Sequence, residues 1–341
     1  MKPQRLVLDQ RISTSRLRRP FPFAEPAAHV TRFFERVGGM SSIFVGNICN
    51  QRCIYCDTPR EPVTSLTPED ARARVDRMAE LGIRRLMFVG GEPTIWRDLP
   101  ALIGHARARG IPDVFIATNG LMLSYERYLR RLLDAGLTGL ELSFDDFDAA
   151  TQRTLSANDQ ADVLLDQAVE HLLPHRDLFL FFLAVVTRVN RRHLPAYLDR
   201  LAALGARRGA PIPAIFTHLK PITFAYENRD LLVEPIGAAA AAIVAAVRLG
   251  LERGLPIIHK ELPPCQTPGY EAYAWEANLV EYCVDLGAAE LASVQSPMLA
   301  KGPRCGECCH DDICVGVYRN YVDQFGWGEF HPVTRPSPGE R

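Results

Sequence analysis

The chain has 341 residues, 47% of them hydrophobic, and a formal net charge of -1. This length allows a large buried core, divided over about two domains or built as a single α/β barrel. The near-neutral charge gives the chain as a whole no electrostatic reason to bind nucleic acid or an anionic membrane. We therefore expect a globular protein with no nucleic-acid or membrane partner.

The first twenty residues differ from the rest, because they carry six Lys or Arg residues against one Asp. We expect a solvated basic tail there. No apolar signal segment follows it, and the Ala-rich stretch 237–247 is too short to cross a bilayer. The sequence predicts a cytoplasmic protein, in which clustered cysteines are better explained as metal ligands or catalytic groups than as disulfides.

Six short β-rich runs alternate with helical patterns along the chain. The expected strands are residues 41–47, 84–91, 113–120, 139–145, 178–187 and 212–221. This alternation predicts parallel β–α units. Right-handed crossovers would curl six such units into a barrel or part of one, and an open doubly wound sheet is the alternative.

The helices between the strands have recognisable boundaries. In residues 66–82, Thr67 can cap a helix, Pro68 suits its first turn and Gly82 can end it. The inner stripe of this helix would be Ala71, Val75 and Met78. A sixth helix is expected over about residues 237–254.

Unusual residues follow the end of every expected strand. A three-cysteine loop follows the first strand, and the motifs GGEPT, TNG, SFDD, TRVN and KPITF follow or end the next five. Ligands of parallel α/β folds bind at the carboxyl ends of the strands. The sequence therefore predicts one site at one rim of the sheet.

The loop after the first strand contains Cys49, Cys53 and Cys56. A structural zinc site normally has four protein ligands. Three thiolates would therefore need a fourth ligand from a distant part of the chain, or would leave one coordination position open. Three thiolates on a four-iron cluster leave one iron free to bind a substrate or cofactor. Three unligated thiols in a loop are the plainer alternative.

This C-x3-C-x2-C run, followed one β–α unit later by GGEPT, resembles the radical S-adenosylmethionine (radical SAM) superfamily over about residues 41–225. The resemblance implies a partial (β/α)6 TIM-type barrel and a [4Fe-4S] cluster whose open iron is chelated by SAM. It also implies reductive cleavage of SAM to methionine and a 5'-deoxyadenosyl radical, which abstracts a hydrogen atom from the substrate. A reductant such as flavodoxin or ferredoxin would be the partner.

The resemblance also implies cofactor contacts at the strand ends. Tyr55 looks like the residue beside the adenine, and Glu92 like the carboxylate near the methionine ammonium. Gly90 and Gly91 would let the backbone approach the ligand. Ser143 is similar to the strand-four hydroxyl that reaches the polar groups of SAM, with Asp145 close behind, and Asn190 matches a recurrent strand-five asparagine. Each of these residues also has a structural explanation, as a turn glycine, a helix cap or a loop closure.

A second group of cysteines lies near the C-terminus, where CGECCHDDIC (305–314) gives Cys305-x2-Cys308-x5-Cys314. It resembles the auxiliary-cluster domains, called SPASM or twitch, that follow the barrel in many radical SAM enzymes. The resemblance implies a second [4Fe-4S] cluster, with Cys265 as the best fourth ligand because two prolines precede it.

Other ligand sets stay open for this second group. Cys309 and Cys283 are rival fourth ligands, although Cys283 also fits a small buried hydrophobic residue. Zinc is the competing occupant, because His310 could complete a mixed site. The expected division is an N-terminal extension over 1–40, the barrel over 41–255 and the auxiliary-cluster domain over 256–341.

The functional prediction is a radical SAM enzyme that acts on a small-molecule biosynthetic substrate. About 40 residues precede the barrel, which is short for a separate leader-binding domain. A maturase of a ribosomally made peptide is the alternative, and a non-radical iron-sulfur electron carrier is an alternative of another class. Candidate proton donors or acceptors at or after the end of the sixth strand are His218, Lys220 and Tyr226, which we expect to face the substrate.

Overall fold

The structure is a computed structural model, and it describes residues 26–278, 282–283, 298–311 and 314–334. The basic tail expected within the first twenty residues lies outside these ranges. Of the rival ligand Cys283, only its backbone place in a short strand is described.

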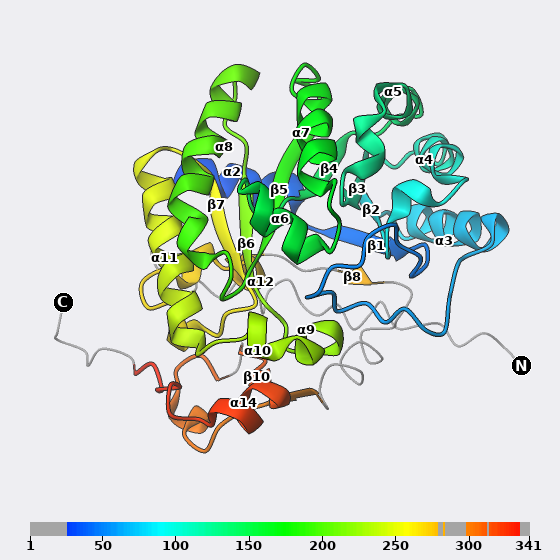
Figure 1. Cartoon of the computed structure of the whole chain (residues 1–341). Helices are drawn as coiled ribbons and strands as arrows, with labels where there is room; N and C mark the ends of the chain where they lie inside the picture. Colours follow the sequence, from blue (N-terminus) through cyan, green and yellow to red (C-terminus); the bar gives the residue numbers. More distant parts are fainter. Residues whose placement is uncertain (1–25, 279–281, 284–297, 312–313, 335–341) are drawn as a thin grey trace, which may run out of the picture.

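A curled parallel sheet forms the centre of the molecule (Figure 1). Its strands are β1 (Met40–Phe44), β2 (Arg85–Val89), β3 (Asp113–Thr118), β4 (Gly139–Ser143), β5 (Phe179–Val186), β6 (Ala214–His218), β7 (Ile257–Lys260) and β8 (Tyr282–Cys283). The order β7-β6-β5-β4-β3-β2-β1-β8 follows the chain from β1 to β7 without reversal. A doubly wound sheet reverses its order at a switch point, so this sheet is a partial barrel, and the predicted fold class is confirmed.

The expected number of six strands is wrong, because β7 continues the sheet beyond β6. This strand spans only four residues and follows Pro256, so its sequence is too short to show an alternating pattern. The sheet therefore extends past residue 255, where the barrel was expected to end. The two-residue β8 pairs with β1 at the opposite edge.

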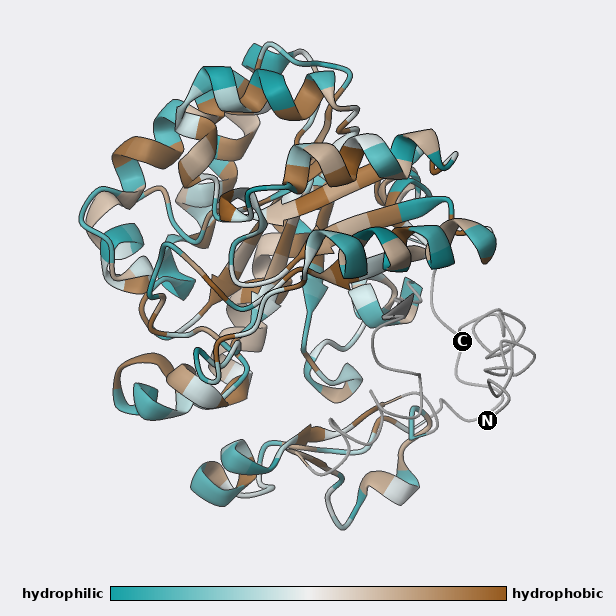
Figure 2. Ribbon diagram, turned by 90° about the vertical axis from the view of Figure 1, so that its right-hand side faces the viewer, coloured by the Kyte–Doolittle hydropathy of each residue, from teal (hydrophilic) through white to brown (hydrophobic). Residues whose placement is uncertain are grey.

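Helices cover the outer face of the sheet (Figure 1). They are α3 (Pro68–Glu80), α4 (Leu99–Ala108), α5 (Glu126–Asp134), α6 (Ala149–Ser156), α7 (Ala161–Leu172), α8 (Leu194–Arg208) and α11 (Ile236–Glu252). Helix α3 begins as predicted, since the Thr67 hydroxyl accepts a hydrogen bond from the Asp70 amide at 3.1 Å. Its expected inner stripe is fully buried. Figure 2 shows hydrophobic strands at the centre and hydrophilic outer faces on these helices.

Helix α2 (Ala28–Val37) packs against the inner face of the sheet. Its Phe33 ring meets the Phe181 ring edge-on, with centroids 5.5 Å apart, and Phe181 belongs to β5. Val30 and Val37 are completely buried in the same cluster. Part of the expected N-terminal extension thus fills the inside of the barrel, which the sequence patterns did not predict.

Inward-facing side chains become partly exposed toward the carboxyl ends of the strands. Phe44, Val89, Ser143 and Val185 are all half-buried, whereas their outward-facing neighbours in the strands are buried. Side chains alternate between the two faces of a strand, so these four residues share the inner face. The barrel is therefore packed by α2 deeper inside and accessible at the rim.

The C-terminal segment lies beside the carboxyl-end rim, next to α9 (Thr223–Glu227) and α10 (Arg229–Leu232) (Figure 1). It contains β9 (Leu299–Ala300), β10 (Val317–Tyr318) and α14 (Arg319–Phe325), and α12 (Trp275–Asn278) precedes it. The Asn320 side chain donates to the Pro221 carbonyl at 3.0 Å, and the Tyr321 hydroxyl accepts from the Ile236 amide at 2.7 Å. Among the helices described, none is long and apolar enough to cross a membrane.

Candidate active site: two cysteine sites at the barrel rim

The loop that follows β1 is folded back on itself at its base. Gly46 and Ser65 form an antiparallel bridge. The Asn47 side chain donates to the carbonyls of Pro59 at 3.0 Å and Pro62 at 2.9 Å, and accepts from the Thr64 amide at 2.8 Å. Asn47 therefore fixes both ends of the segment that carries the cysteines, a role that no sequence motif indicated.

Cys49, Cys53 and Cys56 lie close enough for their charges to interact. Burial is the main reason that the pKa of each thiol is raised, and the neighbouring thiols raise the pKa of Cys53 further. A metal needs thiolates, so these groups require a cationic partner to stabilise their charged form. The three thiols therefore lie together, and their binding of a cluster stays a prediction.

Hydrogen-bond donors surround this site. The Gln51 amide donates to Cys49 Sγ at 3.4 Å, and Asn119 Nδ2 lies 3.8 Å from the same sulfur. Gln51 Nε2 is buried and has no hydrogen-bond partner among the described residues. A buried donor beside three thiols suits an iron-sulfur cluster, whose sulfurs accept hydrogen bonds from the surrounding protein. The residues present fit a cluster held by three cysteines.

Gly90 and Gly91 bring the end of β2 against the cysteine loop. The Gly91 amide donates to the Gly46 carbonyl at 2.7 Å. A Cβ atom on Gly91 would lie 2.4 Å from the Ile48 carbonyl oxygen, and one on Gly90 would lie 2.4 Å from that of Gly46. The two glycines are therefore required by the contact between loops, and their approach to a ligand stays a prediction.

Glu92 is buried at the point where β2 and β3 end. Its Oε1 accepts from the Thr94 amide at 2.9 Å, from the Thr94 hydroxyl and from the Thr118 hydroxyl at 2.6 Å, and its Oε2 accepts from the Asn119 amide at 2.7 Å. Burial raises the pKa of this carboxyl, and the four hydrogen bonds oppose that rise. Asn119 in turn donates to Asn50 Oδ1 at 2.8 Å in the cysteine loop. Glu92 therefore orders the rim, and its contact with SAM stays a prediction.

Tyr55 and Asp145 form a direct hydrogen bond, in which the phenol donates to the carboxylate. Asp145 Oδ1 also accepts from the Val185 amide at 3.0 Å, and burial raises the pKa of Asp145 to about 6. Asn190 Nδ2 donates to the Asp145 carbonyl at 3.0 Å, which ties the ends of β4 and β5 together. Ser143 faces inward in the same strand end. Their roles toward a cofactor remain predictions.

His218 does not face the inside of the barrel, contrary to the expectation that it meets the substrate. It shares the strand face of Ala214 and Phe216, which packs against the outer helices, and it contacts a small space beside Ala239 of α11. Burial lowers the pKa of His218 to about 4, so its ring is neutral near pH 7. Tyr226 lies on α9 with 42% of its surface exposed, and its proton-transfer role stays a prediction.

The segment after β6 packs onto the cysteine loop. The Phe224 amide donates to the Cys56 carbonyl at 3.3 Å, and the Thr223 hydroxyl donates to the Asp57 carbonyl at 3.2 Å. Lys220 Nζ forms an ion pair with Asp57 Oδ2 at 3.0 Å. The first and sixth strand ends therefore meet at one rim, as the sequence predicted.

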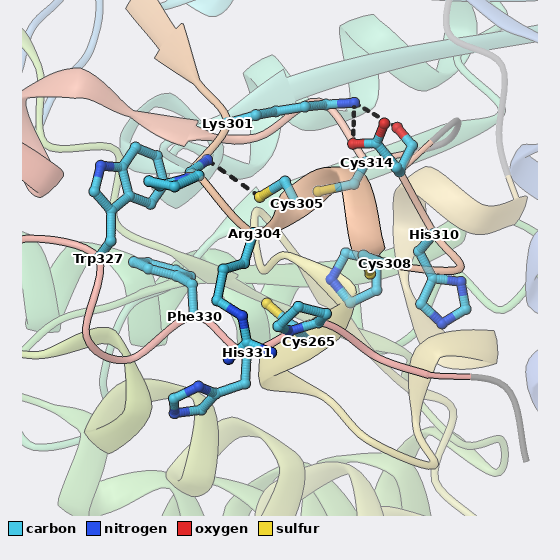
Figure 3. A pocket seen from close by; sticks show the side chains of 15 residues that line it. Cys265, Lys301, Arg304, Cys305, Cys308, His310, Cys314, Trp327, Phe330 and His331 are labelled. Atoms are coloured by element: carbon cyan, nitrogen blue, oxygen red, sulfur yellow. Dashed lines mark hydrogen bonds and ion pairs between the residues drawn. The ribbon is translucent and has the colours of Figure 1, made fainter.

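The second cysteine site is a cavity of about 270 Å³ in the C-terminal segment. Figure 3 shows Cys265, Cys305, Cys308 and Cys314 around a common space. Cys309 does not line this cavity, and its sulfur lies 3.5 Å from His310 Nε2. The geometry favours Cys265 over Cys309 as the fourth member of the set.

The four sulfurs are close enough for their charges to interact. The pKa of Cys265 is raised to about 11, mainly by burial and then by the charges of the other three cysteines. Aromatic rings close one side of the cavity, where Trp327 and Phe330 lie with ring centroids 5.7 Å apart. Partly buried thiols beside such rings again need a cationic partner to stabilise their thiolate form.

Backbone amides point at three of the four sulfurs. Cys305 accepts from the Gly302 amide at 3.2 Å, and Cys314 accepts from the Gly316 amide at 3.4 Å. The Val333 amide donates to Cys308 at 3.4 Å. Such donors stabilise thiolate ligands and tune the reduction potential of an iron-sulfur cluster.

A single zinc ion fits this second site less well than a cluster. Zinc holds its ligands at about 2.0–2.3 Å, which leaves no cavity between them. Within the described parts of the chain, no group of three or more Cys, His, Asp or Glu side chains has the spacing of a single-ion site. A group of four irons and four sulfides would occupy the space that the four cysteines surround.

A curled parallel sheet with three thiols in the loop after its first strand is the arrangement that the resemblance to the radical SAM superfamily implies. Residues 43–201 match the family model for the Radical SAM superfamily. The chain therefore contains a radical SAM domain, and the resemblance seen in the cysteine and GGEPT motifs is confirmed.

Similar proteins include enzymes with different substrates in their names. GTP 3',8-cyclase of Chlorobaculum tepidum is 31% identical over 175 residues, which are 50% of this chain and 52% of that protein. PqqA peptide cyclase of Granulibacter bethesdensis is 33% identical over 163 residues, which are 47% of this chain and 43% of that protein. This chain spans about half the length of the curated relatives it matches.

A solved structure confirms the fold over most of the chain. SuiB of Streptococcus suis, bound to S-adenosylmethionine, has a TM-score of 0.61 over 89% of this chain and 79% of its own. The two sequences are 14% identical, so this likeness concerns the fold alone.

Proposed function

We propose that this protein is a radical SAM enzyme that cleaves SAM reductively and abstracts a hydrogen atom from its substrate. The observation that carries the proposal is the site of Cys49, Cys53 and Cys56, whose thiols lie together beside the side-chain nitrogen Nε2 of Gln51, which is buried and has no partner among the described residues. These three cysteines would hold a [4Fe-4S] cluster with one open iron. When bound, that cluster supplies the electron that cleaves SAM.

The chain's own residues would bind and orient SAM at the rim. Ser143 ends β4 on the accessible inner face, where its hydroxyl can meet a polar group of the ligand. Tyr55 and Asp145 form a polar pair at the mouth of the barrel. Glu92 fixes the ends of β2 and β3 through four hydrogen bonds. The packed interior below this rim keeps bulk water from a reactive radical.

We further propose that Cys265, Cys305, Cys308 and Cys314 hold an auxiliary [4Fe-4S] cluster. Four thiolates would close its coordination, so this cluster would transfer electrons or stabilise the segment rather than bind the substrate. Both cysteine sites belong to the same face of the molecule, because the C-terminal segment contacts the rim through Asn320 and Tyr321. The proposed role therefore concerns electrons that enter or leave during turnover.

The proposed substrate is a small molecule, and a peptide is the second candidate. The relative named GTP 3',8-cyclase supports the first, since its name gives a nucleotide. The relative named PqqA peptide cyclase supports the second, as does SuiB bound to its precursor peptide SuiA, with a TM-score of 0.53. The partly exposed inner face of the barrel can receive either class at the rim.

The test is anaerobic SAM cleavage by reconstituted protein. The variant with Cys49, Cys53 and Cys56 all changed to Ala should form no 5'-deoxyadenosine under reducing conditions. Cys309→Ala is the matched control, because Cys309 belongs neither to the three cysteines of the first site nor to the four of the second. This variant should leave SAM cleavage unchanged. Continued 5'-deoxyadenosine formation by the triple variant would overturn the assigned site.

A further inference from the structure

Lys220 connects parts of the chain that are far apart in sequence. Its Nζ lies 3.0 Å from Asp57 Oδ2 and 3.5 Å from Glu261 Oε1. Glu261 Oε2 also accepts from the Tyr318 hydroxyl at 3.4 Å. These four residues come from the cysteine loop, the end of β6, the end of β7 and β10. We call this set of four residues the Lys220 bridge.

The two ends of the Lys220 bridge lie next to the two cysteine sites. Asp57 directly follows Cys56, and Tyr318 follows Cys314 by four residues. Between Cys314 and Tyr318, the Gly316 amide already donates to the Cys314 sulfur. A displacement at either end of the bridge would therefore reach a cysteine loop.

The ammonium of Lys220 remains charged. Burial opposes its charge, but the nearby carboxylates of Glu261 and Asp57 dominate and raise the pKa of Lys220. Its side chain is 29% exposed and that of Glu261 is 21% exposed, so solvent screens this pair only in part. A permanently charged, paired ammonium is poorly suited to exchange protons with a substrate, which favours a positioning role.

The backbone on both sides of the bridge is strained. Thr223 has φ 49° and Glu261 has φ 63°, in the left-handed region that non-glycine residues rarely adopt. Among the described residues, only Ala157 is a further non-glycine residue with positive φ. Such conformations persist only where surrounding contacts enforce them, and here the contacts include the hydroxyl bond from Thr223 to Asp57 and the ion pair from Glu261 to Lys220.

We propose that Lys220 is a positioning residue that holds the cysteine loop against the C-terminal segment and neutralises the carboxylate beside Cys56. This inference rests on the proposed function only in so far as the first site holds a cluster. Without Lys220, Asp57 would lose the nearest cation and place a less compensated negative charge next to that cluster, although Lys260 also acts on Asp57. A negative charge opposes the addition of an electron, so the reduction potential of the cluster would become more negative.

The experiment compares Lys220→Met, Lys220→Arg and the double variant Asp57→Asn with Lys220→Met in the full reconstituted chain. An anaerobic redox titration follows the cluster signal that is lost when Cys49, Cys53 and Cys56 are replaced. We expect a more negative potential for Lys220→Met, and a return toward the wild-type potential in the double variant and in Lys220→Arg. Arg207→Met is the control, because it removes an exposed ion pair with Glu170 far from the site.

A second measurement does not need a cluster. Amide hydrogen exchange of the chain without iron should become several-fold faster at residues 56–60 and 317–318 in Lys220→Met, and unchanged there in Arg207→Met. If Lys220→Met does not fold, Glu261→Gln should speed exchange at 317–318 alone. Unchanged exchange, or an unchanged potential in folded Lys220→Met, would overturn the positioning role. Absence of iron from the wild-type first site would instead overturn the proposed function. The hydrogen-exchange rates would still test whether Lys220 holds the two segments together.

Discussion

Glu92 has a structural role at the rim in addition to the ligand contact predicted for it. Its carboxylate accepts four hydrogen bonds from Thr94, Thr118 and Asn119, and it is only 2% exposed. Donors that lose a buried acceptor are left without water to replace it. Effects of Glu92 substitutions on SAM binding therefore have to be separated from their effects on folding.

Replacing Glu92 should show these two roles separately. Glu92→Ala should lower the free energy of unfolding by about 3 kcal/mol, because several buried donors lose their acceptor. Glu92→Gln keeps an accepting oxygen and should cost about 1 kcal/mol. If Glu92 also faces the SAM ammonium, the Gln variant should bind SAM at least tenfold more weakly, since it loses the charge.

Urea unfolding and calorimetric titration with SAM measure the two quantities. Glu234→Gln is the matched control, because Glu234 is a buried carboxylate in an ion pair with Arg191 outside both cysteine sites. That variant should lose stability without losing SAM affinity. Equal SAM affinity for Glu92→Gln and the wild type would remove Glu92 from the ligand contacts.

Helices and strands with local sequence signals could be predicted from the sequence. Those that depend on contacts between distant residues could not. Thr67, Pro68 and the buried stripe of α3 are local, and the structure has all of them. The short strand β7 lacks an alternating pattern. The position of α2 inside the barrel follows only from its packing on Phe181 and other inward-facing side chains. Strand pairing and interior packing join residues far apart in the chain, which periodicity does not encode.

The same distinction holds for the site. The spacing of Cys49, Cys53 and Cys56 predicted one shared site. Two other features could not be predicted from a motif, because they depend on how loops contact each other. They are the hydrogen bonds from Asn47 across its loop and the ion pair between Lys220 and Asp57. The structure places His218 on the outer face of β6 and not toward the inside of the barrel, because the face of a strand's last residue follows from its register.

The contact between the β2 end and the cysteine loop gives a prediction at the level of elements. Gly91→Ala would place Cβ 2.4 Å from the Ile48 carbonyl and 2.5 Å from that of Asn47, so two backbones must separate. We expect a loss of about 2 kcal/mol or more in the free energy of unfolding and less iron in the first site.

Gly104→Ala is the control for this change, because Gly104 lies inside α4 and the nearest atom outside that helix, the Ala135 carbonyl oxygen, would be 3.9 Å from the new Cβ. Alanine favours a helix interior, so this variant should gain about 0.5–1 kcal/mol. Urea unfolding and iron content after reconstitution measure both variants. Equal stability of the two would contradict the close packing of the loops.

At the scale of the whole molecule, the radical SAM domain and the C-terminal segment form one rim with two cysteine sites. The segment contacts the barrel through Asn320 and Tyr321, and the Lys220 bridge joins the two cysteine loops. Each site groups thiols with hydrogen-bond donors around them. This arrangement supports the proposal of two separate clusters, of which one would activate SAM and the other would transfer electrons.

The most direct test of this claim is the amount of iron and sulfide per folded chain after anaerobic reconstitution of two variants. One variant lacks Cys49, Cys53 and Cys56, and the other lacks the four cysteines of the C-terminal cavity. Two independent clusters predict about four irons and four sulfides in each variant, and about twice that number in the wild type. Iron near zero in the folded first variant would contradict the second cluster and leave the C-terminal cysteines to be tested with zinc.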